Sequence, residues 1–203
     1  MTKRKQSPSF DTRRFDIHSS FRNSAFTIIE LLVVIIIIMI LAGLVLSISS
    51  YVQNKGARAR AETEIAAMSA ALESYKADNG IYPRDNPGNQ YTDNLNAKVD
   101  VDPTQSKYKN ASLYLFLQLS GLDANQQAVA NMKSYFAFKP QMLGHPPGNA
   151  TTVAYIRDPF GNSYGYSTAN QADPNKGDNP TYDLWSTAGG LASADTVKWI
   201  KNW

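Results

Sequence analysis

A single carboxylate interrupts the longest apolar run of the chain. Residues 26–46 read FTIIELLVVIIIIMILAGLVL, and Glu30 is the only charged residue among them. A helix of about 20 apolar residues is long enough to cross the hydrocarbon core of a membrane. An acidic side chain inside such a segment costs about 2.5–3.5 kcal/mol on insertion scales. We therefore expect Glu30 to have a partner that compensates its charge.

Two simpler interpretations of the run fit it less well. A signal peptide has an apolar core of about 7–15 residues, followed by a small-x-small cleavage site. Here the run is longer, it carries an acid near its start, and no Ala-x-Ala follows. A plain membrane anchor would have no reason to keep Glu30.

The residues around this acid resemble a known processing motif. Residues 24–30 (SAFTIIE) and the following LLVV resemble the cleavage and methylation motif of type IV pilins and type II secretion pseudopilins. The resemblance implies that a prepilin peptidase cuts between Ala25 and Phe26 and that the new Phe26 amine is methylated. It also implies that Glu30 of one subunit neutralises the amine of a neighbour during filament assembly. The family usually has Gly before the cut, where this chain has Ala25.

Positive charge is concentrated before the apolar run. Residues 1–25 hold six Lys or Arg and two Asp, whereas the other 178 residues hold 14 Lys or Arg and 15 Asp or Glu. Under the positive-inside rule, this asymmetry predicts that the N-terminus is cytoplasmic and that the part after a single membrane pass is exported. The resemblance implies that the leader 1–25 is cleaved, that the membrane is the inner membrane and that the head is periplasmic. The nearly neutral remainder gives no electrostatic reason to expect nucleic-acid binding.

Helical character continues beyond the apolar run. Residues 47–78 contain no proline, and Asn79-Gly80 followed by Pro83 is a typical helix end. We expect a membrane-spanning or filament-core half at 26–48 and an amphipathic periplasmic half at 49–80. The heptad-like spacing lasts about two heptads, so packing on the chain's own domain is favoured over a coiled coil. The expected apolar stripe is Ala61, Ile65, Met68, Leu72 and Tyr75.

The remaining sequence predicts a small α+β head over residues 81–203. Its fold class is a long N-terminal helix packed on a small antiparallel β-sheet of three or four strands, as in the pilin-like fold that the resemblance implies. Apolar spacing and turn residues predict the other elements. They are a polar surface excursion at 84–110, a second helix or else a strand at 112–119, strands at 134–138, 152–156, 163–167 and 181–186, a tight hairpin turn at 158–162 and a polar loop at 168–180.

Short motifs in the second half of the chain resemble one member of the family. The segments 78–83 (DNGIYP), 158–164 (DPFGNSY), 182–186 (YDLWS) and 200–203 (IKNW) are similar to signatures of the G-type major pseudopilin. Residues 84–152 do not match and form a divergent insert. The resemblance implies a structural subunit of a type II secretion pseudopilus, a membrane-rooted helical filament that assists protein export. Implied partners are other copies of the chain, minor pseudopilins, an inner-membrane assembly platform, the prepilin peptidase and, before assembly, membrane lipid.

The same resemblance implies a structural calcium ion in the C-terminal loop. Its ligands would be the Leu184 carbonyl, Ser186 and Asp195. The acidic residue that the family has soon after the strand is missing, because Ala188 and Gly189 stand there. Calcium prefers several oxygen ligands, usually with two carboxylates. Turn packing by hydrogen bonds is the alternative for this loop.

Other functions remain as alternatives. The N-terminal motif also suits a type IV pilus pilin for adhesion, motility or DNA uptake, and the insert also suits a membrane-anchored periplasmic binding module. No nucleophile–base constellation is present, so we expect no enzyme. His18 lies in the leader, and His145 lies in a Pro/Gly loop where exposure is expected. The chain has no cysteine, which excludes disulfides.

Overall fold

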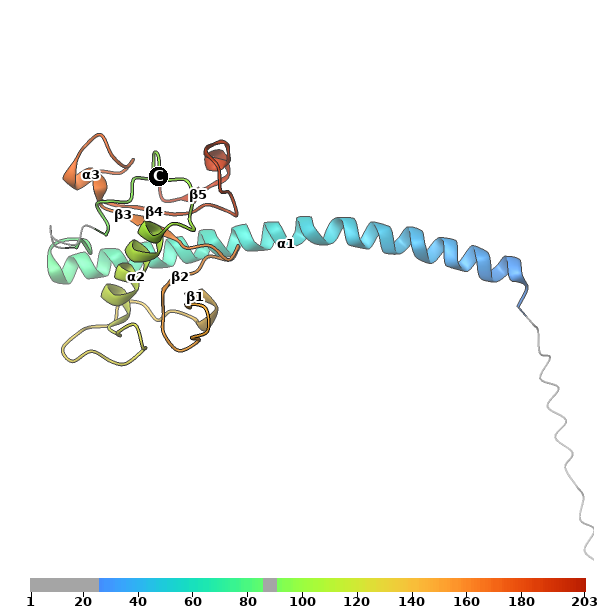
Figure 1. Cartoon of the computed structure of the whole chain (residues 1–203), viewed down its shortest axis with the longest axis horizontal. Helices are drawn as coiled ribbons and strands as arrows, with labels where there is room; N and C mark the ends of the chain where they lie inside the picture. The colour runs from blue at the N-terminus through green and yellow to red at the C-terminus, as the bar shows by residue number, and fades with distance from the viewer. Residues whose placement is uncertain (1–25, 86–90) are drawn as a thin grey trace, which may run out of the picture. The chain divides into compact units, whose positions relative to one another are not determined.

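The structure, a computed structural model, describes residues 26–85 and 91–203. It divides the chain into two units, Met1–Ser47 and Ile48–Trp203, and we call the second unit the head. The helix α1 (Ile28–Asn79) begins in the first unit and ends in the head (Figure 1). The leader, with Ala25 and His18, lies outside the described residues.

The part of α1 in the first unit is apolar on every side. Its large apolar side chains between Phe26 and Leu46 are 43–89% exposed. By length and composition, α1 can cross a membrane. A soluble protein rarely leaves so much contiguous apolar surface uncovered, so lipid or other apolar helices must cover it.

The part of α1 in the head carries the predicted apolar stripe. Ala61, Ile65, Met68 and Leu72 are 0–5% exposed, and the half-buried Tyr75 ring lies 5.2 Å from the Tyr135 ring. The stripe therefore packs on the chain's own head, as predicted. The helix end at Gly80 is also confirmed, because Gly80 has a φ of +79° and its N–H donates to the Lys76 carbonyl at 2.7 Å.

The second helix, α2 (Ser106–Ser120), is longer than predicted and settles the choice between helix and strand. It buries Leu115, Phe116 and Leu119 in the main core, together with the α1 stripe. The predicted strand at 134–138 is wrong. The N–H groups of Tyr135 and Phe136 both donate to the Leu119 carbonyl, at 2.8 and 2.9 Å, so this segment closes the end of α2 instead of joining a sheet.

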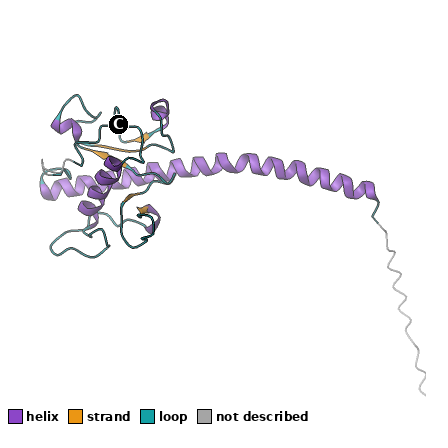
Figure 2. Cartoon of the chain, viewed as in Figure 1, coloured by secondary structure: helices purple, strands orange, loops and turns teal. Residues whose placement is uncertain are grey.

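The head contains two small antiparallel sheets within the described residues (Figure 2). One pairs β1 (Leu143–Gly144) with β2 (Tyr155–Ile156), and the other has the order β3-β4-β5. The predicted α+β class, a long N-terminal helix with small antiparallel sheets, is confirmed, but the described strands form two sheets of two and three strands instead of a single sheet. Only the last two residues of 152–156 form a strand, and β1 and β5 were not predicted. The other elements are β3 (Gly165–Ser167), β4 (Asp183–Ser186), β5 (Ile200–Lys201), η1 (Pro140–Met142), α3 (Ala169–Ala172) and η2 (Ser193–Lys198).

A second core cluster surrounds Trp185 on β4. The Trp185 ring is fully buried, stacks on Trp199 with ring centroids 5.9 Å apart, and donates its Nε1–H to the Tyr108 hydroxyl at 3.1 Å. Gly165 faces this ring across the sheet, and a Cβ built there would lie 2.2 Å from an indole carbon. Only glycine allows the backbone of β3 to approach Trp185 so closely.

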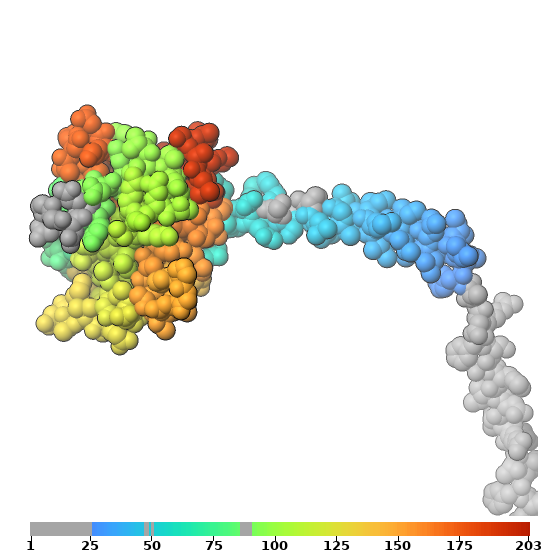
Figure 3. Space-filling model, in the orientation of Figure 1, coloured from blue at the N-terminus to red at the C-terminus, as the bar shows by residue number. Residues whose placement is uncertain are grey.

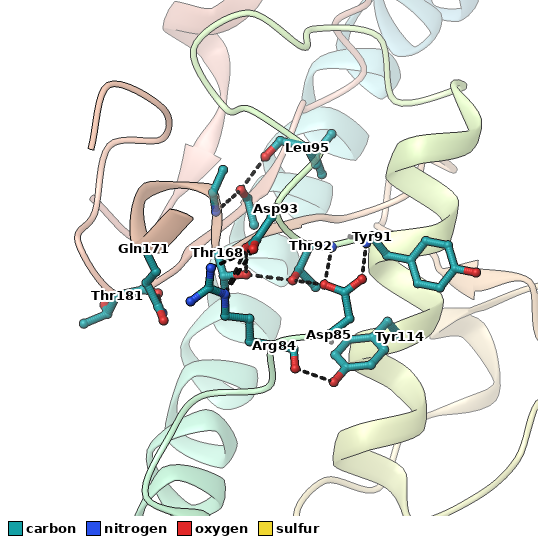
Figure 4. A network of polar contacts seen from close by, with 12 residues as sticks. Arg84, Asp85, Tyr91, Thr92, Asp93, Leu95, Tyr114, Thr168, Gln171 and Thr181 are labelled. Carbon is teal, nitrogen blue, oxygen red and sulfur yellow. Dashed lines mark hydrogen bonds and ion pairs between the residues drawn. The ribbon is translucent and has the colours of Figure 1, made fainter. Parts of the chain in front are cut away.

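The segment 84–110 is not the surface excursion that its polarity predicts. Leu95, Ala97 and Tyr108 belong to the cluster around Trp185. Polar contacts also attach the segment to the residues after β3 (Figure 4). The Arg84 guanidinium pairs with Asp93 at 2.8 Å, and Asp93 accepts a hydrogen bond from Thr168 at 2.7 Å. Part of the divergent insert is therefore integral to the head.

Candidate functional site

The start of α1 is a capping box around Glu30, the acid of the apolar run. Thr27 directly precedes the helix, and its N–H and hydroxyl donate to Glu30 Oε2 at 2.9 and 2.8 Å. The Glu30 N–H donates in return to Thr27 Oγ1 at 3.3 Å. Reciprocal bonds of this kind satisfy donors that have no partner within the first turn of a helix. The pattern Thr-x-x-Glu at residues 27–30 is the sequence signal for this capping box, which was not predicted.

The capping box gives the Glu30 carboxylate hydrogen bonds but no counter-charge. Glu30 forms no ion pair with any residue that the structure describes. Its carboxylate borders a shallow apolar groove of about 370 Å³, which is lined by Phe26, Ile29, Glu30, Val33 and Val34. The site thus combines an acid that is hydrogen-bonded to Thr27, the residue after Phe26, with an apolar surface that another helix or a lipid chain can fill.

The predicted cleavage and methylation residues lie at the edge of the described chain. Phe26 is 78% exposed and precedes α1. Ala25 lies outside the described residues, so the bond between the two residues has no described geometry. The roles of Ala25 and Phe26 in cleavage, of Phe26 in methylation and of Glu30 in assembly stay predictions.

The three residues predicted to bind calcium are engaged by other partners. The Leu184 carbonyl accepts the Asn202 N–H at 3.2 Å, Ser186 donates to Asp158 Oδ2 at 2.5 Å, and Asp195 pairs with the Lys198 ammonium at 2.9 Å. The described residues contain no group of three His, Cys, Asp or Glu suited to a metal ion. These contacts do not test the predicted set of a carbonyl, a hydroxyl and one carboxylate, so calcium binding stays a prediction.

The hairpin at 158–162 is organised by a buried acid. Asp158 is 2% exposed, and its Oδ1 accepts the N–H groups of Phe160 and Asn162 at 3.0 and 2.8 Å. Its other oxygen accepts the Ser186 hydroxyl, which joins the turn to β4. Burial raises the pKa of Asp158, although these hydrogen bonds act in the opposite direction. The turn was predicted, but this function of Asp158 was not.

His145 is half-buried, not exposed as expected. Its Nδ1 lies 2.8 Å from the Thr152 carbonyl, so the ring joins two ends of a loop. This contact fits a structural role for His145.

These features define a protein class. An exposed apolar helix that follows Phe26 and Thr27 directly and carries Glu30 in its first turn is typical of chains with a processed, methylated N-terminus. The family described as "Prokaryotic N-terminal methylation motif" matches residues 20–46. The chain therefore carries this motif.

Beyond the motif, the chain is similar to type II secretion system core protein G. It is 37% identical to this protein of Pectobacterium carotovorum subsp. carotovorum over 90 residues, which are 44% of this chain and 56% of the relative. It is 36% identical to the protein of that name from Aeromonas hydrophila over 89 residues, 44% of this chain and 60% of the relative. For Klebsiella michiganensis (strain ATCC 8724), the identity is 40% over 83 residues, 41% of this chain and 56% of the relative.

The matches confirm the resemblance to G-type pseudopilins that the motifs predicted. The chain spans about half the length of the curated relatives that it matches. No solved structure matches the chain.

Proposed function

We propose that the chain is a structural, non-enzymatic subunit of a type II secretion pseudopilus. The observation that carries the proposal is Glu30, an acid without an ion-pair partner among the described residues, at the start of an exposed apolar helix. The relatives named type II secretion system core protein G support the choice of secretion. A type IV pilus pilin shares the N-terminal motif and is the second candidate.

The proposed assembly step pairs charges between copies of the chain. Cleavage between Ala25 and Phe26 would create a cationic amine, which methylation keeps basic. The capping box holds Glu30 near this end of the helix. Pairing the acid with the amine of a neighbouring copy removes two isolated charges from an apolar environment, where each is costly alone. The exposed apolar surface of α1 would then be covered by the same part of other copies.

We propose that the subunit reaches this filament from the inner membrane. Residues 1–25 would be cytoplasmic until the prepilin peptidase removes them, and the head would be periplasmic. Further expected partners are minor pseudopilins and an inner-membrane assembly platform. The length and apolar character of α1 are consistent with membrane anchoring before assembly.

Replacement of Glu30 tests this function. We expect Glu30→Ala to leave leader cleavage and membrane insertion intact, and to reduce incorporation into filaments at least tenfold, because the neighbour's amine loses its counter-charge. The measurement is the amount of variant in sheared filaments, with mass spectrometry of the mature N-terminus. Ile29→Val is a matched control, since it changes the same groove without changing charge.

Two outcomes separate the alternatives. Normal incorporation of Glu30→Ala, or a functional protein that keeps residues 1–25, would contradict the assembly role and favour an anchored binding module. If assembly depends on Glu30 but deletion of the gene leaves protein export intact, the type IV pilin is the better assignment.

A further inference from the structure

An exposed apolar tip lies on the loop between β4 and β5. This loop covers residues 187–199 and contains η2. Leu191 and Val197 on it are 54% and 87% exposed, and Val197 is the most exposed large apolar side chain among the described residues of the head. A single exposed apolar residue is ordinary, so the surroundings of the tip decide what it means.

The tip is held against the beginning of the head. Arg58 Nη1 on α1 donates to the Lys198 carbonyl at 2.7 Å, directly after Val197 in the chain. Figure 3 shows the loop, in red, beside the first turns of α1 that belong to the head. Arg58 is only ten residues beyond Ile48, where the head begins. The loop therefore lies at the end of the head that the chain enters from the apolar run.

Four cations lie on the segments that carry or hold the tip. Lys55 precedes Arg58 on α1 by three residues, Lys198 lies in the loop directly after Val197, and Lys201 follows the loop on β5. Asp195 is the acid on the loop itself, and it pairs with Lys198. The next acids along α1 are Glu62 and Glu64. At a rise of 1.5 Å per residue, Glu62 lies about 6 Å beyond Arg58 along the helix axis. The entry end of the head is thus basic.

Aromatic side chains accompany two of these cations. The Lys55 ammonium lies 5.3 Å from the centre of the Tyr51 ring, and the Lys201 ammonium lies 4.8 Å from a Trp203 ring centre. Tyr51 is 61% exposed. Tyr, Trp and basic residues are enriched where a protein meets the boundary between hydrocarbon and water.

We propose that the loop 187–199 docks on the surface of a bilayer that contains anionic phospholipids. Leu191 and Val197 enter the boundary between headgroups and acyl chains, while the four cations Lys55, Arg58, Lys198 and Lys201 contact headgroup phosphates. The inference rests on the proposed membrane anchoring of residues 26–46. Lys55 follows Leu46 by nine residues, so anchoring keeps the tip at a high local concentration near the lipid surface.

Docking of this kind would hold the head on the membrane while a subunit waits for assembly. Each apolar or cationic contact with lipid would have to break when the subunit enters a filament. The composition of the membrane would therefore influence how readily subunits leave it.

A single introduced cysteine can report the docked state, because the chain has none of its own. The full chain with Val197→Cys is reconstituted into phosphatidylglycerol–phosphatidylcholine vesicles and into phosphatidylcholine vesicles. An impermeant, environment-sensitive fluorophore then labels only the outward-facing heads. We expect a blue-shifted emission that brominated acyl chains quench in the anionic vesicles, and a much weaker effect in the neutral ones.

Two sets of variants sharpen the result. Lys55→Gln or Lys201→Gln is expected to lower the ratio of docked to undocked label about fivefold for each charge removed. Ile81→Cys is the matched control, because Ile81 is 62% exposed but follows the other end of α1. The emission of its label is expected to stay at the wavelength of a water-exposed fluorophore in both kinds of vesicle. A label on Leu191→Cys should lose its blue shift when Val197→Asp is added.

Flotation of the vesicles separates this inference from the proposed function. If the chain floats with the vesicles but the labels at 197 and 81 behave alike, docking is wrong while anchoring stands. If the blue shift is the same in anionic and neutral vesicles and grows with the number of protein molecules per vesicle, a second copy covers the tip. That result also overturns the proposal. A chain that fails to float overturns both.

Discussion

At the scale of single residues, Asp158 couples the stability of the head to pH. It is the buried acid that closes the 158–162 turn, and burial raises its pKa. An exposed Asp titrates near pH 3.9, so between that value and the raised pKa, unfolding releases a proton. The contribution of Asp158 to stability is therefore fully present below the unfolded pKa and is lost as pH rises through the folded pKa.

Asp158→Asn should remove this pH dependence. We expect the difference in unfolding free energy between the wild type and Asp158→Asn to shrink as pH rises from about 4. Urea unfolding of the detergent-solubilised chain at several pH values measures it. Asp158→Ala should cost about 3 kcal/mol, because three hydrogen bonds are lost inside the core. A difference that stays constant with pH would mean that Asp158 does not titrate in this range.

Calcium gives a second prediction at this scale. If calcium binds as the resemblance implies, it replaces the Lys198 ammonium beside Asp195, and added calcium should raise the thermal unfolding temperature of the head. A site filled at a hundred times its Kd would add about 2.7 kcal/mol, which is easily measured. A calcium-dependent rise in Tm that disappears in Asp195→Asn would establish the site implied by the resemblance.

At the scale of secondary-structure elements, the pairing of β3 with β4 requires that residue 165 has no side chain. Gly165→Ala would place a methyl group 2.2 Å from the rigid, buried Trp185 ring. We expect a loss of about 3 kcal/mol in unfolding free energy, with weaker near-ultraviolet circular dichroism from the displaced indole. Gly56→Ala on α1 is the control, because a Cβ there meets nothing within 4 Å. It should stabilise the helix by up to about 1 kcal/mol. Equal effects of both substitutions would contradict the packing argument.

Elements with strong local signals could be predicted from the sequence. The α1 stripe follows the helical period over many turns, and Gly80 marks its end. The strands β1 and β5 could not be predicted, because each has two residues and exists only through its partner strand. The segment 134–138 alternates like a strand, but its N–H groups serve the end of α2. Pairing with residues from other elements determines the structure of β1, β5 and 134–138, and the local sequence pattern does not encode that pairing.

The candidate site shows the same division. Glu30 and Phe26 could be found from sequence because an acid in an apolar run is costly and because the motif is local. The engagement of Leu184 and Ser186 could not be found, because their partners Asn202 and Asp158 lie 18 and 28 residues away in the chain. The partner of Asp195, Lys198, lies only three residues further along η2, a local spacing that the sequence does show. The burial of Leu95 and Ala97 was missed because polar residues surround them in the sequence.

At the scale of the whole molecule, the two units carry separable functions. The first unit holds Glu30 and the proposed assembly surface, whereas the head holds both core clusters. Met68 is fully buried in the main core, and Glu30 lies on the exposed apolar run. Substitutions at sites that share no partner are expected to have additive effects.

A double-substitution experiment tests this separation. Met68→Ala should lower the unfolding free energy of the head by about 3 kcal/mol through the cavity it leaves, without preventing membrane insertion. Glu30→Ala should leave head unfolding unchanged in detergent while it reduces filament incorporation. The double variant should unfold like Met68→Ala to within about 0.5 kcal/mol. If Glu30→Ala shifted the unfolding of the head, assembly defects could no longer be assigned to the loss of one intermolecular charge pair, because head stability would contribute to them.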